Sequence, residues 1–245
     1  MRIKLTIAYE GTRYCGWQVQ PNGVSIQKTV QNALETILRH PIALSGAGRT
    51  DAGVHALGQV AHFDTEHAME PSRLRLALNA LLPSDIRIIA AESVADEFHA
   101  RYSALGKIYH YHLHLDPSIL PHLRLYRTRV FGSFHCAALR EAAVLFLGTH
   151  DFRSFANGSG KSLEDSVRTL MRLDVIEQKG GVRLEFEGDG FLYKMVRNIV
   201  GTLLEVASGR RAPKSVCELF NGKERVRAGA TAPPYGLFLV SVKYP

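Results

Sequence analysis

The first hundred residues change between two hydrophobic periods. Residues 2–9 alternate apolar and polar side chains, which is the pattern of a half-buried β-strand. Residues 25–40 instead carry Ile26, Val30 and Leu34 on one helical face. The same criteria predict further strands at 41–46, 58–65 and 86–94 and a second helix at 72–82. The predicted order is strand, helix, strand, strand, helix, strand, written βαββαβ.

The rest of the chain repeats this order without repeating the sequence. Strands are predicted at 107–115, 167–178, 181–188 and 236–242, and helices at 135–148 and 191–209. Two polar segments, 116–130 and 151–166, are predicted to be inserted loops. The two parts join near residues 104–107.

Two βαββαβ units in one chain are typical of a duplicated ferredoxin-like fold. We therefore expect an α+β protein with an N-terminal half at residues 1–104 and a C-terminal half at residues 105–245. The antiparallel sheets of the two halves are expected to form a central cleft, which is a natural place for a ligand to bind.

Bulk composition narrows the class of protein. The chain has 46% hydrophobic and 22% charged residues, which is ordinary for a folded globular protein. No apolar run approaches the roughly 20 residues that span a bilayer, and the N-terminus lacks the apolar block of a signal peptide. We therefore expect a cytoplasmic protein. Cys15, Cys136 and Cys217 are too few and too far apart for a disulfide framework or a zinc-binding pair.

The net charge of +7 at pH 7 changes the expected partners. An excess of Lys and Arg creates a positive field that attracts polyanions, above all nucleic acids. Many metabolic enzymes are basic as well, so a motif is needed to support a nucleic-acid partner.

One carboxylate stands in a segment rich in glycine, GAGRTDAGVHALGQ at residues 46–59. Asp51 follows Arg49 by two residues, and the surrounding glycines let another backbone or a ligand approach closely. An Asp in such a turn often only bonds the local backbone. A carboxylate kept ionised by a guanidinium is also a competent nucleophile or base near neutral pH. The segment is therefore either a turn or a catalytic site in which Asp51 is the reactive group.

Three histidines on one predicted strand indicate a second kind of site. His110, His112 and His114 alternate along residues 107–115 and so share a face, where a His-x-His pair can bind a metal. No Cys or acidic residue lies on the predicted strand itself to complete a ligand set, which favours a solvated or RNA-facing surface. The opposite face carries Tyr109, which by the same criteria is an ordinary core aromatic.

Three further polar stretches fit simpler explanations. GSGKS at residues 158–162 has Phe155 where a phosphate-binding loop needs glycine, so a polar loop is favoured over nucleotide hydrolysis. His150 and Asp151 have serines nearby, but no GxSxG turn follows a strand, so serine hydrolase chemistry has little support. Asp189 stands between a predicted strand and a predicted helix, which favours a turn and helix N-cap.

Several motifs resemble those of the tRNA pseudouridine synthase A (TruA) family, and they run in the family's order from one end of the chain to the other. They are YCGWQ at 14–18, GRTDAGVHA at 48–56, FHARYSA at 98–104, KIYHY at 107–111, MVRNIVG at 195–201 and APPYGLFLV at 232–240. The resemblance implies the pseudouridine synthase fold. It also implies isomerisation of uridine to pseudouridine at positions 38 to 40 of the anticodon stem-loop of tRNA. On this basis we expect a homodimer that binds tRNA and uses neither a cofactor nor a metal.

The resemblance also assigns roles to four residues. Asp51 lies in the signature loop and is expected to be the nucleophile that attacks a flipped uridine, at either the sugar or the ring. Tyr109 is expected to stack against the target base and to assist proton removal. Arg197 is expected to pair with Asp51, and Arg49 to contact the RNA backbone and help hold the base out.

Two other functions stay open at this point. A catalytically silent tRNA-binding protein or chaperone of the same fold would keep the basic surface and tolerate the loss of Asp51. A metal-dependent hydrolase would use His110, His112 and His114 and would lose its activity in EDTA.

Overall fold

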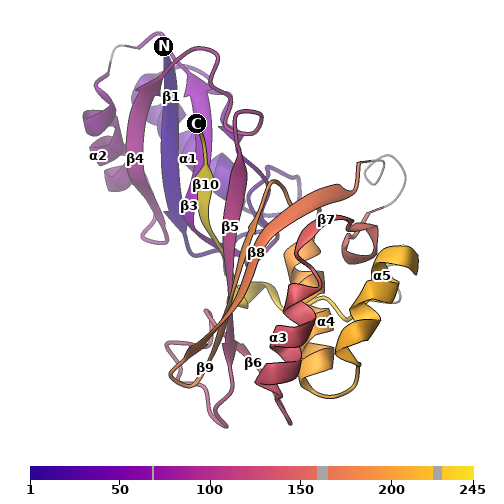
Figure 1. Cartoon of the computed structure of the whole chain (residues 1–245). Helices are drawn as coiled ribbons and strands as arrows, with labels where there is room; N and C mark the ends of the chain where they lie inside the picture. The colour runs from indigo at the N-terminus through magenta and orange to yellow at the C-terminus, as the bar shows by residue number, and fades with distance from the viewer. Residues whose placement is uncertain (68, 159–164, 223–227) are drawn as a thin grey trace. The chain divides into compact units, whose positions relative to one another are not determined.

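The computed structural model describes residues 1–67, 69–158, 165–222 and 228–245 (Figure 1). Within these ranges the chain forms ten β-strands and five α-helices, an α+β fold as predicted. It divides into two compact units, one of Met1–Lys107 with Phe238–Pro245 and one of Ile108–Leu237. No helix within the described ranges has both the length and the apolar character needed to cross a membrane.

The first unit contains the predicted order of strands and helices. Its elements are β1 (Arg2–Tyr9), α1 (Ile26–Leu38), β2 (Ser45–Gly46), β3 (His55–Asp64), α2 (Pro71–Leu81) and β4 (Ile86–Val94), joined at the end of the chain by β10 (Leu237–Lys243). The strands pair in the order β4-β1-β3-β10, with β2 also on β3. β1 is antiparallel to both β3 and β4, and β2 is antiparallel to β3, whereas β10 runs parallel to β3.

Alternation along β1 builds the core of the first unit. Ile3, Leu5, Ile7 and Tyr9 are all buried, which confirms the predicted inner face. The helix α1 begins where the Ser25 side chain accepts a hydrogen bond from the N–H of Lys28. α1 packs on α2 and α2 packs on β4, so the two helices cover the sheet and leave the ends of its strands for loops.

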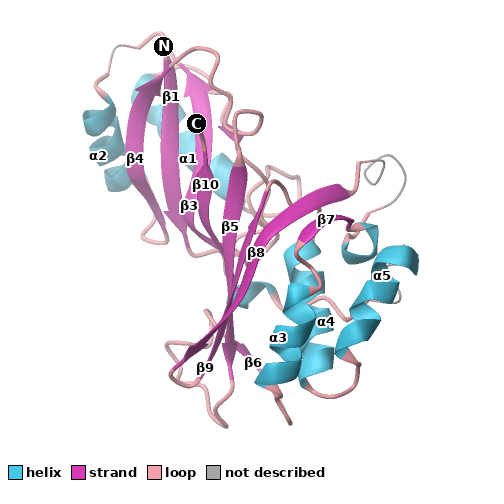
Figure 2. Ribbon diagram, in the orientation of Figure 1, coloured by secondary structure: helices cyan, strands magenta, loops and turns pink. Residues whose placement is uncertain are grey.

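Over its described residues, the second unit combines a sheet with three α-helices, as can be followed in Figure 2. Its elements are β5 (Gly106–His114), β6 (Thr128–Arg129), α3 (Cys136–Val144), β7 (Gly148–Asp151), β8 (Val167–Gln178), β9 (Gly181–Gly188), α4 (Met195–Ala207) and α5 (Val216–Gly222), with the first two residues of β5 counted in the first unit. The strands pair in the order β5-β9-β8-β7, with β6 also on β5. α3 packs on β8 and on α4.

The last strand differs from the prediction, which placed it in the C-terminal half. Phe238 pairs with His55 and Leu239 with Ala56, so β10 extends the sheet of the first unit. β2 covers β3 only at Ala61 and His62. The other end of this edge of β3 therefore has unpaired backbone groups, and β10 satisfies them.

The long helix begins later than predicted, and Asp189 is not its N-cap. α4 begins at Met195 after Lys194, whose φ of 61° lies in the left-handed region and interrupts the helix. Asp189 instead accepts the N–H of Thr169 through its side chain, at 3.0 Å. It therefore joins the ends of β8 and β9.

Candidate active site

The turn that carries Asp51 is fixed through its backbone. The buried Thr50 shares a 2.8 Å hydrogen bond with the Tyr9 hydroxyl, and its carbonyl accepts the N–H of Trp17 at 3.1 Å. The Asp51 carbonyl accepts the N–H of Val54 at 3.1 Å, which closes the turn. Asp51 itself is only partly buried, so a fixed turn carries an accessible acidic residue.

Two glycines before α1 let the chain pack directly on this turn. A Cβ at Gly16 would lie 2.5 Å from the Thr50 carbonyl oxygen, and the φ of Gly16 is 102°, a conformation that favours glycine. A Cβ at Gly11 would lie 2.0 Å from the Val54 carbonyl oxygen. The contact accounts for the glycine of the YCGWQ stretch, because only a residue without a side chain allows backbone to meet backbone here.

Two cationic side chains flank the turn. Arg49 is exposed, and its Nε donates to the side-chain oxygen of Gln18 at 3.2 Å. A Cβ at Gly48 would lie 2.7 Å from Nζ of Lys107, so the ammonium group lies against this glycine. Lys107 belongs to the KIYHY stretch, and the sequence alone assigns it no role. An exposed guanidinium and an ammonium group at one turn are suited to bind a phosphate backbone.

His55, four residues after Asp51, has a structural role. It is 1% exposed, and its Nδ1 accepts the N–H of Gly11 at 3.1 Å. The ring stacks on Phe238 with centroids 4.6 Å apart. The imidazole therefore connects β3 with β10 and with the segment that follows β1.

Tyr109 and Arg197 lie in the second unit, on β5 and α4. Tyr109 is buried and meets Phe191 edge to face, with ring centroids 5.0 Å apart.

Tyr111 and Arg197 bind neighbouring backbone carbonyls. The Tyr111 hydroxyl donates to the Pro233 carbonyl at 2.8 Å, and Nε of Arg197 donates to the Ala232 carbonyl at 2.7 Å. Burial raises the pKa of Tyr111, so this hydroxyl stays protonated and acts as a donor.

Asn198 and Gly201, which belong to the same MVRNIVG stretch as Arg197, make structural contacts. Asn198 is fully buried, and its side-chain oxygen accepts the hydroxyl of Thr231 at 2.7 Å. A Cβ at Gly201 would lie 1.7 Å from the carbonyl oxygen of Ala230. Backbone contact with residues 228–232 therefore fixes α4 beside the carbonyl that Arg197 binds.

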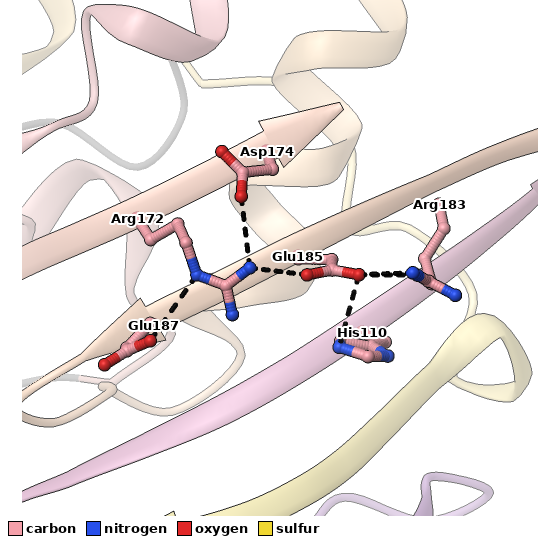
Figure 3. A network of polar contacts seen from close by, with 6 residues as sticks. All are labelled: His110, Arg172, Asp174, Arg183, Glu185 and Glu187. Atoms are coloured by element: carbon pink, nitrogen blue, oxygen red, sulfur yellow. Dashed lines mark hydrogen bonds and ion pairs between the residues drawn. The ribbon is translucent and has the colours of Figure 1, made fainter. Parts of the chain in front are cut away.

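His110 belongs to a network of charged side chains on β5, β8 and β9 (Figure 3). Glu185 pairs with Arg172 and Arg183, and its Oε1 lies 3.7 Å from Nε2 of His110. Arg172 also pairs with Asp174, at 3.1 Å. Burial alone would raise the pKa of the Glu185 carboxyl, but hydrogen bonds from the two arginines hold it below its ordinary value. Glu185 is thus an ionised link between β9 and its neighbours.

The histidine face is more buried than predicted. His114 is 3% exposed, and its Nε2 hydrogen-bonds with the carbonyl of Ser118 at 2.8 Å, so the solvated or RNA-facing surface is wrong at this position. His110 and His112 are half-buried. Among the residues that the structure describes, no group of three His, Cys, Asp or Glu side chains is placed to hold a metal ion.

His112 should make the stability of the protein depend on pH. Burial lowers its pKa to about 4, and the charges of His110, Arg127 and Arg183 act in the same direction. The unfolded side chain titrates near pH ~6.5, so the stability that neutral His112 contributes is complete above that pH and is lost as the pH falls toward 4. Between pH 7 and 4, we expect wild type to lose about 3 kcal/mol more unfolding free energy than His112→Gln, measured by urea denaturation. Equal losses in the two proteins would contradict this role.

The other polar candidates of the second half have structural partners. Asp151 accepts the hydroxyl of Ser166 at 2.6 Å, and the buried Ser154 donates to a backbone carbonyl at 2.6 Å. His150 hydrogen-bonds with a backbone carbonyl at 2.8 Å. These side chains therefore do not form a hydrolase triad. Residues 159–162 of the GSGKS stretch lie outside the described residues.

Comparison with known proteins supports one family along the chain. The family model for tRNA pseudouridine synthase matches residues 5–103 and 142–245. The chain is similar to tRNA pseudouridine synthase A 1 of Protochlamydia amoebophila (strain UWE25), with 54% identity over 98% of this chain and 95% of the relative. It is 48% identical to tRNA pseudouridine synthase A of Chlamydia muridarum (strain MoPn / Nigg), over 100% of this chain and 92% of the relative. It is 45% identical to tRNA pseudouridine synthase A of an Exiguobacterium strain (ATCC BAA-1283 / AT1b), over 99% of this chain and 98% of the relative.

Matches of this length and identity define a class, that of enzymes that isomerise uridine in RNA. This chain belongs to the tRNA pseudouridine synthase family. Of the residues predicted from sequence, the structure places Arg49 and Asp51 on one turn of the first unit and Tyr109 and Arg197 in the second unit.

Proposed function

We propose that this protein converts uridine to pseudouridine at positions 38, 39 and 40 of the anticodon stem-loop of tRNA, with Asp51 as the nucleophile. The family supplies the reaction class, so the enzyme is an isomerase that acts on uridine in tRNA. The observation that carries the role of Asp51 is its accessible position on a turn fixed by backbone contacts, two residues from an exposed arginine.

The reaction needs only groups that this chain supplies. Uridine and pseudouridine contain the same atoms. The bond from N1 to C1′ of the sugar breaks, a bond from C5 to C1′ forms, C5 loses a proton and N1 gains one. One nucleophile and positioned proton transfers suffice for this exchange. We therefore assign the reaction to Asp51 without a cofactor or a metal.

Binding must offset the cost of taking the target base out of its stack, which is a few kcal/mol. We propose that Tyr109 stacks against the flipped base, that Arg49 contacts the RNA backbone, and that Arg197 helps keep Asp51 ionised. The cationic side chain of Lys107 beside Gly48 supports a phosphate contact near the Asp51 turn.

We further propose that both units are ferredoxin-like and that the protein acts as a homodimer. In the first unit, the strand order β4-β1-β3 with β2 on β3 supports the ferredoxin-like assignment. Sedimentation at micromolar protein concentration tests the dimer.

The test of the proposed function uses an unmodified tRNA transcript with uridines at positions 38 to 40, in buffer with EDTA. Pseudouridine is mapped by carbodiimide adducts and primer extension. We expect stops at these positions with wild-type protein and the same rate with and without EDTA. Stops elsewhere would contradict the stem-loop assignment, and loss of activity in EDTA would contradict the metal-free reaction.

A further inference from the structure

One aromatic residue outside the Asp51 turn is strongly exposed. Tyr102 is 77% exposed, and among the described residues its hydroxyl has no hydrogen-bond partner. It belongs to the FHARYSA stretch, to which the proposed reaction gives no role. An aromatic ring that stands in solvent with a free face can stack on a planar group of a ligand.

The turn that carries Tyr102 is held firmly. The N–H of His99 donates to the Ser103 hydroxyl at 3.0 Å, and the N–H of Ser103 donates to the His99 carbonyl at 2.9 Å. The N–H of Ala100 donates to Nδ1 of the buried His62 at 3.2 Å, and the Tyr244 hydroxyl donates to the Ala100 carbonyl at 2.6 Å. A ring on such a turn is preorganised, so it loses little conformational entropy when it binds a ligand.

Polar and cationic groups support the ring of Tyr102. The His99 ring lies against it, with centroids 4.4 Å apart and planes 33° apart. Nδ1 of His99 accepts the N–H groups of Arg101 and Tyr102, which fixes the imidazole under the turn. The guanidinium carbon of Arg101 lies 5.7 Å from the Tyr102 centroid. Among the described residues, no carboxylate pairs with Arg101.

The same turn shares a small apolar cluster with the start of the Asp51 segment. Ala100 packs with Ala47 and Val60, and Phe98 and Tyr244 cover this cluster. The N–H of Ala47 also donates to the Val60 carbonyl at 2.7 Å. The turn with Tyr102 and the segment that leads to Asp51 therefore pack against the same cluster within the first unit.

We propose that His99, Arg101 and Tyr102, the 99–102 platform, stack an unpaired nucleobase of the bound tRNA other than the uridine that is modified. Tyr102 supplies the stacking face, and Arg101 binds the adjoining phosphate. An aromatic ring beside an unpaired guanidinium, in a protein with net charge +7, fits a nucleobase and its phosphate better than an apolar partner. This inference rests on tRNA being the substrate and does not depend on Asp51 being the nucleophile.

The first test compares dissociation constants for an unmodified tRNA transcript. Tyr102→Leu should bind about tenfold more weakly than wild type, because it loses the stacking face, and Tyr102→Phe should stay within about twofold. Arg101→Gln should reduce the slope of log affinity against log salt by about one. Leu76→Ala on α2, where the side chain is 64% exposed, is the matched surface control and should change nothing.

A fluorescent variant reports the contact directly. The chain has one tryptophan, Trp17, which is 1% exposed, so the additional emission of Tyr102→Trp comes from position 102. Transcript should quench this emission and shield it from iodide. Equal affinities of wild type and Tyr102→Leu, or no quenching by bound tRNA, would overturn the inference. Shielding that rises with protein concentration alone would overturn it as well, because a second copy of the chain would then cover the ring. A different result would contradict the proposed function, namely the absence of pseudouridine at positions 38 to 40 after incubation with wild-type protein.

Discussion

Asp51→Asn is expected to make no measurable pseudouridine while it still binds tRNA. The amide has nearly the same shape as the carboxylate but is not a nucleophile at neutral pH, so kcat should fall by at least about a thousandfold. Such a decrease corresponds to about 4 kcal/mol of lost transition-state stabilisation. The turn should survive the change, because the hydrogen bonds of the Asp51 backbone carbonyl and of Thr50 remain in the variant. Mapping by carbodiimide and primer extension measures product, and filter binding with the same transcript measures affinity.

The controls separate chemistry from binding and folding. Arg49→Gln lies on the same turn and removes a cation that we assign to RNA contact, so it should weaken tRNA binding, which Asp51→Asn should not do. Melting temperatures of both variants should stay within about 3 °C of wild type, because the two changed residues are partly or fully exposed. Residual activity of Asp51→Asn close to that of wild type would assign the nucleophile to another residue. If wild type also binds the transcript without forming pseudouridine, the chain is a silent tRNA-binding protein.

The regular elements of the fold could be predicted because their patterns are local. Alternation over residues 86–94, 167–178 and 181–188 coincides with β4, β8 and β9 at both ends. The partner of β10 could not be predicted in this way, because pairing of Phe238 with His55 depends on an edge of β3 far away in sequence. The start of α4 cannot be predicted from sequence either, since the left-handed backbone at Lys194 leaves no mark in the hydrophobic pattern.

The candidate site was predictable in part for a related reason. A carboxylate among glycines is visible in the sequence, and so is the arginine two residues before Asp51. The requirement for glycine at position 16 can be seen only in the structure. The Thr50 carbonyl that excludes a side chain there lies 34 positions later in the chain. The sequence shows Lys107 only as part of a motif, because no local pattern places its ammonium group against Gly48.

Gly201→Ala is expected to be the most destabilising single-methyl substitution in α4. The new Cβ would stand 1.7 Å from the Ala230 carbonyl oxygen, and Gly229 presses its own backbone against the same part of the helix. Ala is favoured over Gly within a helix by about 1 kcal/mol, but overpacking against backbone costs about 3 kcal/mol or more because the segment cannot rotate away as a side chain could. A net loss of about 2–4 kcal/mol should lower the melting temperature by about 10 °C, which scanning calorimetry measures.

Gly48→Ala is the matched control, since it adds the same methyl group where the nearest atom belongs to a side chain and not to the backbone. Its Cβ would meet Nζ of Lys107 at 2.7 Å, the mobile end of a long side chain. Lys107 can turn aside at little cost, so the unfolding free energy should change by less than about 1 kcal/mol. Similar melting temperatures for the two variants would show that residues 228–232 yield to α4. Loss of stability in Gly201→Ala alone would show that this segment is a rigid support, and kcat should then fall as well, because Arg197 bonds to its Ala232 carbonyl.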